Sequence, residues 1–223
     1  MSMSRIFRHP FWLIPLAFLL NAAPSLFLSF LPLDWCVPLS LQTAILSFAS
    51  LAFLVALPLA IIIFFFHEKP ASYGWRLPVD TRAARNLTLS ATLLLLPVIL
   101  FLSTQDAFRA YYSRPGISIF TFLVTGGAFT FLYYLSEEFL FHGFLFFGLW
   151  PRLGYHSFWI ISTLFAFLHI TKPPAEIALS FFGSLIFCHL SLKTKSFLPA
   201  TIVHFIIAFS LNALTTFAPP LHF

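Results

Sequence analysis

Residues 133–147 read Tyr-Tyr-Leu-Ser-Glu-Glu-Phe-Leu-Phe-His-Gly-Phe-Leu-Phe-Phe, so the carboxylates of Glu137 and Glu138 and the imidazole of His142 interrupt a phenylalanine-rich run. No other charged residue occurs between positions 116 and 150. An ionised carboxylate in the hydrocarbon core of a bilayer costs about 2.5–3.5 kcal/mol on insertion scales. Two neighbouring carboxylates must therefore be paired, protonated or directed into a water-filled cavity. A structural polar cluster that locks helices together meets this condition, and so does a catalytic site within a membrane.

The composition of the 223-residue chain is that of a membrane protein. Hydrophobic residues make up 60% of it and charged residues only 9%, against about 25% charged residues in ordinary soluble domains. We therefore predict an all-α, polytopic membrane helix bundle that forms one integral membrane domain over residues 1–223. Basic clusters with interleaved aromatic residues are absent from the sequence, so we expect no nucleic-acid partner. The two cysteines, Cys36 and Cys188, show neither a zinc-binding spacing nor a disulfide framework.

A helix that crosses about 30 Å of hydrocarbon needs about 20 apolar residues. Seven segments are expected to be transmembrane helices, although the fifth is short. Their approximate ranges are 10–31, 41–66, 87–103, 116–149, 157–170, 175–192 and 197–217.

The lysines and arginines are distributed unevenly over the two expected sides of the membrane. Of the twelve, only Arg109, Arg114 and Lys172 fall on the side opposite the N-terminus. Because loops rich in Lys and Arg stay in the cytoplasm, we expect a cytoplasmic N-terminus in a multi-pass protein of the bacterial inner (cytoplasmic) membrane. Glu176 lies near an expected span end, where we expect water to reach it.

Two further histidines, His169 and His204, lie inside apolar runs. The turn between the fourth and fifth helices centres near Leu153, with Glu137 sixteen residues before it and His169 sixteen residues after it. At about 1.5 Å per residue, both lie about 24 Å from that turn. His204 lies about ten residues beyond the next turn, about 15 Å deep, a difference that helix tilt would absorb. We therefore expect Glu137, His169 and His204 to converge in one internal cavity.

Helical geometry separates the two glutamates. Glu138 and His142 are spaced i, i+4 and share a helix face, whereas Glu137 shares its face with Phe141. Glu138 therefore has a local partner, and Glu137 must find its partner on another helix. This makes Glu137 the candidate for chemistry and Glu138 with His142 the candidate supporting pair.

At these residues the chain resembles the CPBP family of intramembrane proteases, also called the CAAX protease and bacteriocin-processing or Abi family. That family carries Glu-Glu-x-x-x-Arg, then Phe-x-x-x-His, then His-x-x-x-Asn, each on a membrane helix. The corresponding segments here are Glu-Glu-Phe-Leu-Phe-His at 137–142, Phe-Ala-Phe-Leu-His at 165–169 and His-Phe-Ile-Ile-Ala at 204–208. His142 thus replaces the Arg, and Ala208 replaces the Asn. A glycine-centred segment, Tyr-Gly-Trp-Arg-Leu at 73–77, resembles a weaker feature of the family.

The resemblance implies a glutamic-type endopeptidase that hydrolyses a peptide bond of a membrane-anchored protein or peptide at the lipid bilayer. Because the sequence has no compact metal-ligand motif, we expect activity without a metal. Residues 1–115 would supply the N-terminal spans and residues 116–217 the catalytic half, with the active site buried between helices four, five and seven. The resemblance assigns the general base to Glu137, a water-holding role to His169 and a position near the oxyanion to His204.

The supporting residues are Glu138 and His142, together with Asn212, which lies two turns beyond His204 and is the candidate substitute for the missing Asn.

Two other interpretations stay open. One acid and two histidines suit zinc, so a zinc-dependent hydrolase would use Glu137, His169 and His204 as ligands, although no short-spaced pair such as His-Glu-x-x-His is present. The two motif departures favour a non-catalytic family member that binds peptides or supports export or immunity.

Overall fold

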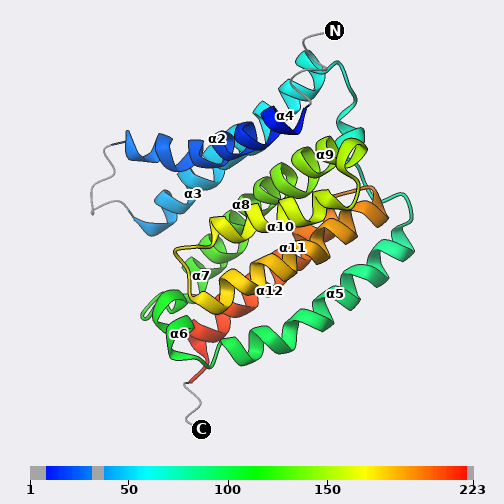
Figure 1. The fold of residues 1–223 in the computed structure, drawn as a ribbon. Helices are drawn as coiled ribbons and strands as arrows, with labels where there is room; N and C mark the ends of the chain where they lie inside the picture. The colour runs from blue at the N-terminus through cyan, green and yellow to red at the C-terminus, as the bar shows by residue number, and fades with distance from the viewer. Residues whose placement is uncertain (1–8, 32–37, 220–223) are drawn as a thin grey trace.

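The computed structural model describes residues 9–31 and 38–219, and this part of the chain consists of helices and turns without a strand (Figure 1). The first elements are α2 (Pro10–Ser29), α3 (Leu39–Ser50), the π-helical η1 (Leu51–Ala56), α4 (Leu57–Ala60), the π-helical η2 (Ile61–Phe65) and the 3-10 turn η3 (Pro70–Tyr73). They are followed by α5 (Thr81–Leu102), α6 (Asp106–Tyr112), α7 (Ile119–Phe122) and the π-helical η4 (Leu123–Phe129). The last elements are α8 (Thr130–Glu138), the π-helical η5 (Phe139–Leu145), α9 (Phe146–Leu153), α10 (His156–Leu168), α11 (Pro174–Thr194) and α12 (Leu198–Phe217).

Six helices in the described ranges are long and apolar enough to cross a membrane, and the predicted all-α polytopic bundle is confirmed. They are Pro10–Ser29, Leu39–Phe65, Thr81–Leu102, Ile119–Leu153, Pro174–Thr194 and Leu198–Phe217.

The fifth expected span corresponds to α10, which has 13 residues and is about 20 Å long, shorter than the hydrocarbon thickness of about 30 Å. It ends at Leu168, and the next helix begins only at Pro174, preceded by Pro173. A residue before proline is held away from the α region, so this Pro-Pro pair separates the two helices.

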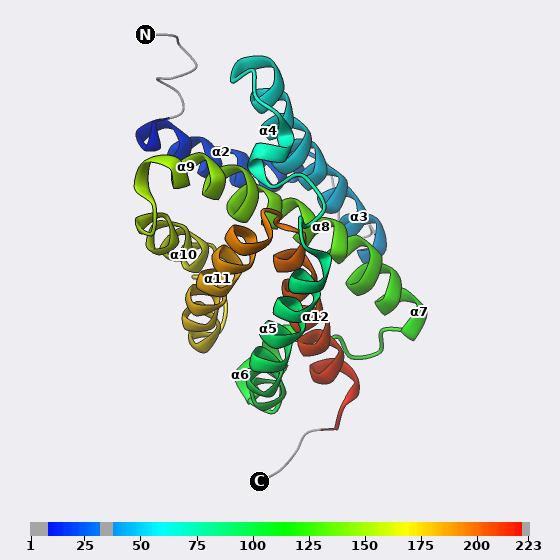
Figure 2. The same ribbon diagram turned by 90° about the vertical axis from the view of Figure 1, so that its right-hand side faces the viewer.

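The long helix from α7 to α9 is the centre of the bundle (Figures 1 and 2). The α2 and α3 helices pack on one side of it, and α12 packs against α8 on the other. The α12 helix also contacts α5 and α11, and α11 contacts α10. Helices four, five and seven of the sequence prediction therefore meet through α8, α10, α11 and α12.

Two clusters of buried apolar side chains lie in the bundle. One joins α2 and η1 to the central helix and includes Leu13, Leu54, Phe139, Phe144 and Phe146. The other joins α5, α11 and α12 and includes Leu95, Ile99, Phe187, Val203 and Leu211. Because lipid tails are as apolar as these side chains, close packing rather than removal from water holds such helices together.

The glycine-centred segment packs tightly against the central helix. Gly74 adopts a φ of 78°, and a Cβ atom at this position would lie 2.7 Å from Cε2 of Phe147. The Tyr73 ring stacks with Phe66 and Phe144, and the carbonyl of Arg76 accepts a hydrogen bond from the Ser196 hydroxyl. The segment thus connects the end of η2, through Phe66, to the turn before α12, through Ser196.

Gly74→Ala is expected to lower the free energy of unfolding by about 1–3 kcal/mol more than Gly116→Ala, since overpacking adds a cost of that size. Gly116 is the matched control because it has the same φ of 78°, but a Cβ atom added there would meet no other atom within 4 Å. Thermal unfolding of both variants in detergent measures the difference. Equal losses would show that the close approach to Phe147 contributes nothing.

Candidate active site

The central helix changes its hydrogen-bonding pattern at the two carboxylates. The α8 helix ends at Glu138, and the π-helical η5 begins at Phe139. Short π-helical segments within α-helices are rare and occur frequently at functional sites. Glu137, Glu138 and His142 are all buried, so the helix carries its acidic pair inside the bundle.

Glu138 is held on both sides by histidines. Its Oε2 lies 2.7 Å from Nδ1 of His142, and its Oε1 lies 2.7 Å from Nδ1 of His204. The other ring nitrogen of His142, Nε2, lies 2.9 Å from the Ser184 hydroxyl. The structure thus brings Glu138 and His142 together, as their i, i+4 spacing predicts. It adds a contact between Glu138 and His204 of α12 that fixes the position of the carboxylate.

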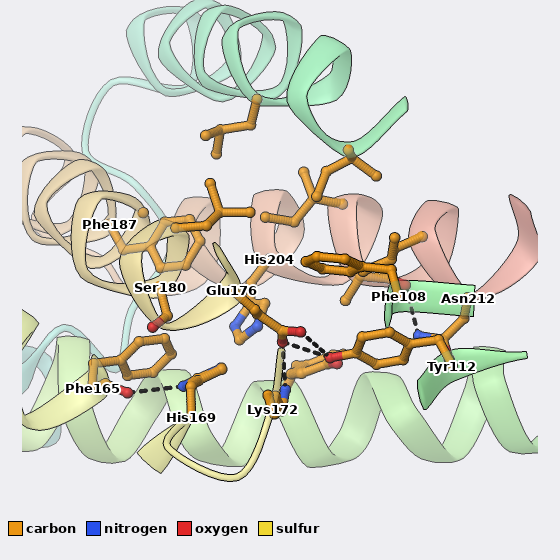
Figure 3. A pocket seen from close by; sticks show the side chains of 18 residues that line it. Phe108, Tyr112, Phe165, His169, Lys172, Glu176, Ser180, Phe187, His204 and Asn212 are labelled. Carbon is orange, nitrogen blue, oxygen red and sulfur yellow. Dashed lines mark hydrogen bonds and ion pairs between the residues drawn. The ribbon is translucent and has the colours of Figure 1, made fainter. Parts of the chain in front are cut away.

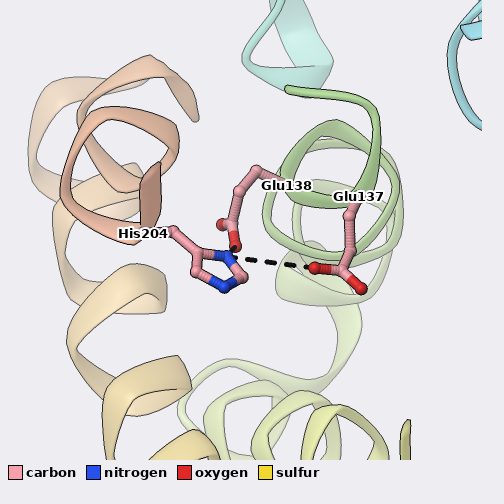
Figure 4. Close-up of side chains that lie close together, drawn as sticks. All are labelled: Glu137, Glu138 and His204. Atoms are coloured by element: carbon pink, nitrogen blue, oxygen red, sulfur yellow. Dashed lines mark hydrogen bonds and ion pairs between the residues drawn. The ribbon is translucent and has the colours of Figure 1, made fainter. Parts of the chain in front are cut away.

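Glu137 has weaker protein contacts. The hydroxyl of Tyr133 donates a hydrogen bond of 3.3 Å to its Oε1, and its Oε2 lies 3.9 Å from Nδ1 of His204. Figure 4 shows the two carboxylates facing the His204 ring from the neighbouring helix. Glu137 therefore keeps more of its hydrogen-bonding capacity for a further ligand than Glu138 does.

His169 caps the end of α10. Its Nδ1 lies 2.8 Å from the carbonyl oxygen of Phe165 (Figure 3). Because a carbonyl can only accept a hydrogen bond, Nδ1 carries the proton. The Nε2 atom of the neutral ring is then an acceptor, and it is suited to bind a water molecule.

The expected single cavity is divided into two adjoining cavities. His204 lines the first and Glu137 lines the second. Three residues line both cavities: Tyr134, His169 and Lys172. The Tyr134 ring lies against the His204 ring, with 4.2 Å between ring centroids. An aromatic side chain at the boundary of the two cavities is what the sequence prediction of one shared cavity missed.

Lys172, Glu176 and Tyr112 form a second polar cluster beside His169 (Figure 3). Glu176 accepts a hydrogen bond of 2.5 Å from the Tyr112 hydroxyl and forms an ion pair of 2.8 Å with Lys172 Nζ. Burial, followed by the charge of Glu176, raises the pKa of Tyr112. Only 8% of the Glu176 surface is exposed, because Tyr112 and Lys172 contact its carboxylate. The access of water that was expected for Glu176 is therefore restricted to the first cavity, which it lines.

Some partners in the site had a sequence signal and others had none. Tyr133 stands four residues before Glu137 on the same helix, a spacing that sequence reasoning could have used. Lys172 lies before the start of α11, and its nearness to Glu176 in the sequence was the only signal for that pair. Ser184 had no comparable signal, because its contact with His142 depends on how α11 is rotated.

The comparison with known proteins agrees with this geometry. Residues 118–210 match the type II CAAX prenyl endopeptidase Rce1-like family. The recognition of the CAAX protease family is confirmed. The matched segment contains all three motifs, and therefore Glu137, Glu138, His169 and His204. No curated protein and no solved structure shows a significant match to the chain.

The two departures from the CAAX protease motifs have different structural outcomes. His142, which replaces Arg, contacts Glu138 and Ser184 and leaves neither ring nitrogen without a neighbour. Ala208, which replaces Asn, lines the first cavity with His204 and offers no polar group. Asn212 also lines that cavity, but its amide donates a hydrogen bond of 2.8 Å to the Ala208 carbonyl. Asn212 therefore uses one donor on its own helix.

One group of side chains in the described part of the chain could hold a metal ion. Glu137, Glu138 and His204 place one ligand atom each within 4.8 Å of one another. His169, which the zinc interpretation of the sequence included, is not part of this group, and Glu138 is.

The fit to zinc requires rearrangement. Zinc–ligand distances of about 2.0–2.1 Å in a tetrahedron separate neighbouring ligand atoms by about 3.3 Å, whereas Glu138 Oε1 and His204 Nδ1 lie 2.7 Å apart. The observed arrangement therefore fits a direct hydrogen bond between the two side chains, and an ion there would have to open it.

Proposed function

We propose that the chain is a glutamate-dependent intramembrane endopeptidase that hydrolyses a peptide bond of a membrane-anchored protein or peptide. One observation carries the proposal: a buried group of Glu137, Glu138 and His204 lies in the segment that matches a family of proteases. Residues 116–217 form the catalytic half in this proposal, and the chain is one integral membrane domain.

The first step is the activation of water. Glu137, which has the weaker protein contacts, takes a proton from a water molecule that Nε2 of His169 also binds. The hydroxide oxygen attacks the peptide carbonyl carbon, and the carbonyl oxygen becomes an oxyanion. Glu137 then gives its proton to the leaving amine as the carbon–nitrogen bond breaks. A positioned general base of this kind contributes about 10²- to 10⁴-fold to a rate.

Glu138 acts through His204 rather than on the substrate. Its Oε1 holds Nδ1 of His204 at 2.7 Å, while its Oε2 pairs with His142, whose other ring nitrogen contacts Ser184. A protonated His204 oriented in this way presents Nε2–H to the oxyanion. Hydrogen-bond donors fixed before the reaction stabilise developing negative charge without reorganisation.

The membrane setting completes the proposal. The protein resides in the bacterial inner membrane with a cytoplasmic N-terminus, because the Lys- and Arg-rich loops lie on that side. The substrate is a protein or peptide held at the bilayer by its own anchor, which brings the scissile bond to the depth of the buried glutamates.

Cleavage by the reconstituted protein tests the proposal. Proteoliposomes containing the full chain would be incubated with a panel of membrane-anchored peptides, some carrying a prenylated C-terminal cysteine motif and others a transmembrane segment. Mass spectrometry should detect two products from at least one peptide class, and none with Glu137→Gln. Peptide binding without cleavage by the wild type would instead support the non-catalytic function, which the missing polar group at Ala208 favours.

Turnover is expected to be unchanged in 1,10-phenanthroline or EDTA, because the short Glu138–His204 contact leaves no room for a tetrahedral ion. The rate of peptide cleavage in proteoliposomes before and after chelation measures this. The second candidate function, a zinc-dependent membrane hydrolase, is favoured by the proximity of Glu137, Glu138 and His204. A loss of cleavage that added zinc restores would establish that candidate in place of the metal-free mechanism.

A further inference from the structure

The proposed hydrolysis requires hydrogen-bond donors where the oxyanion develops, and one expected donor is missing. The family motif places an Asn at position 208, and this chain has Ala208. Asn212 donates to the Ala208 carbonyl oxygen, so it is directed along its own helix. His204 is then the one family donor left in the first cavity, and a second donor must come from outside the three motifs.

Tyr134 lies where such a donor is needed. It is on α8, four residues before Glu138, and its ring lies 4.2 Å from the His204 ring, centroid to centroid, with 38° between the planes. It lines the cavity that contains His204 and also the cavity that contains Glu137. A carbonyl group attacked by water from the Glu137 side, with its oxygen toward His204, would therefore lie beside Tyr134.

The hydroxyl of Tyr134 is also uncommitted, in contrast to those of its neighbours. Tyr133 donates to Glu137, and Tyr112 donates to Glu176. Within residues 9–31 and 38–219, no protein atom forms a hydrogen bond with the Tyr134 hydroxyl. A neutral phenol is both a donor and an acceptor, and the Tyr134 side chain is half-buried in the lining of both cavities.

Lys172 supports the same placement. It is the third residue, with His169, that lines both cavities beside Tyr134, and its ammonium is paired with Glu176 at 2.8 Å. That ion pair directs the ammonium toward Glu176, so we assign Lys172 the role of adding positive potential at the cavity boundary. The phenol has no such competing partner.

We propose that Tyr134 is a catalytic residue whose phenolic O–H donates a hydrogen bond to the oxyanion, in place of the Asn that the family motif has at position 208. This inference rests on the proposed function. As water adds to the peptide carbonyl, the C=O π electrons move to oxygen, and Tyr134 and His204 share the resulting charge. The phenol keeps its proton throughout, so the overall reaction consumes one water and releases one acid and one amine.

Tyr134→Phe tests the inference because it removes only the hydroxyl and keeps the ring beside His204. Loss of an oxyanion donor lowers kcat by about 10²- to 10³-fold, and we expect that loss here with KM nearly unchanged, since the interaction forms only in the transition state. The matched control is Tyr155→Phe, whose side chain is 73% exposed at the turn before α10. It should retain wild-type kcat.

Ala208→Asn provides the second measurement. Restoring the motif donor should raise kcat at least about tenfold in the Tyr134→Phe background, and less than about threefold in the wild type, where the phenol already serves the oxyanion. A rise of tenfold or more in the wild-type background would overturn the inference even if Tyr134→Phe failed to fold, because it would show that the oxyanion lacks a second donor.

The outcomes separate this inference from the proposed function. Cleavage by the wild type, loss of cleavage in Glu137→Gln and an unchanged kcat in folded Tyr134→Phe would overturn the role of Tyr134 and leave the protease function standing. A raised KM with unchanged kcat would also overturn it, since Tyr134 would then bind substrate without stabilising the transition state. Absence of cleavage by the wild type across the peptide panel would overturn both.

Discussion

Glu137→Gln is expected to reduce cleavage of a membrane-anchored peptide by about 10²- to 10⁴-fold, the contribution typical of a general base. The amide keeps the size of the side chain but cannot take a proton from water. The Tyr133 hydroxyl can still donate to the amide oxygen, so folding should change little. Initial rates in proteoliposomes measure the effect.

The matched control is Asp106→Asn, the same acid-to-amide change at an exposed position in α6, which should keep the wild-type rate. If Glu137→Gln retained normal turnover while a well-folded Glu138→Gln were inactive, the roles of the two glutamates would be reversed.

Glu138→Ala is expected to lower the free energy of unfolding by about 3–5 kcal/mol, the cost of removing one partner from a buried ion pair. The carboxylate contacts His142 and His204 at 2.7 Å each, and its exposed surface is 0%. His204 would keep a buried nitrogen without its hydrogen-bond partner, and His142 would lose its ion-pair partner. Denaturant-induced unfolding in detergent, followed by circular dichroism, measures the loss.

Ser184→Ala is the control, because it removes one neutral hydrogen bond to His142 and should cost about 1 kcal/mol. Similar losses for the two variants would mean that Glu138 is not the residue that organises the cluster. A Glu138→Ala protein that is stable but inactive would assign Glu138 to the chemistry instead.

The fold was largely predictable because the length of each apolar run along the sequence is enough to identify a membrane span. Runs of about 20 apolar residues define spans by length alone, and the proline pair at 173–174 marked where α10 ends. The depth count that matched Glu137 with His169 worked because it needs only the rise per residue. The spacing of Glu138 and His142 worked for the same reason, since it involves a single helix.

The remaining contacts of the site depend on how the helices are rotated about their axes. Glu138 reaches His204 on α12, and Tyr134 lies against the same ring. These rotations are set by the packing of large side chains such as Phe165 and Phe187, whose rings lie 5.7 Å and 5.4 Å from the His204 ring. The π-helical η5 changes the direction in which side chains after Glu138 point around the helix axis. No residue type in the sequence predicts this π-helical segment.

The shortness of α10 determines where hydration is needed inside the bilayer. A helix about 20 Å long leaves the chain from His169 to Pro173 as irregular backbone about 10 Å short of the full hydrocarbon thickness. Backbone without regular hydrogen bonds is tolerated at that depth only where protein buries it or water-filled space adjoins it. Leu168, His169 and Lys172 line the same cavity as Glu137. His169, Ile170 and Lys172 donate their N–H groups to protein carbonyls. Water in this cavity would serve the remaining carbonyl groups of the break and would also be the reactant that hydrolysis consumes.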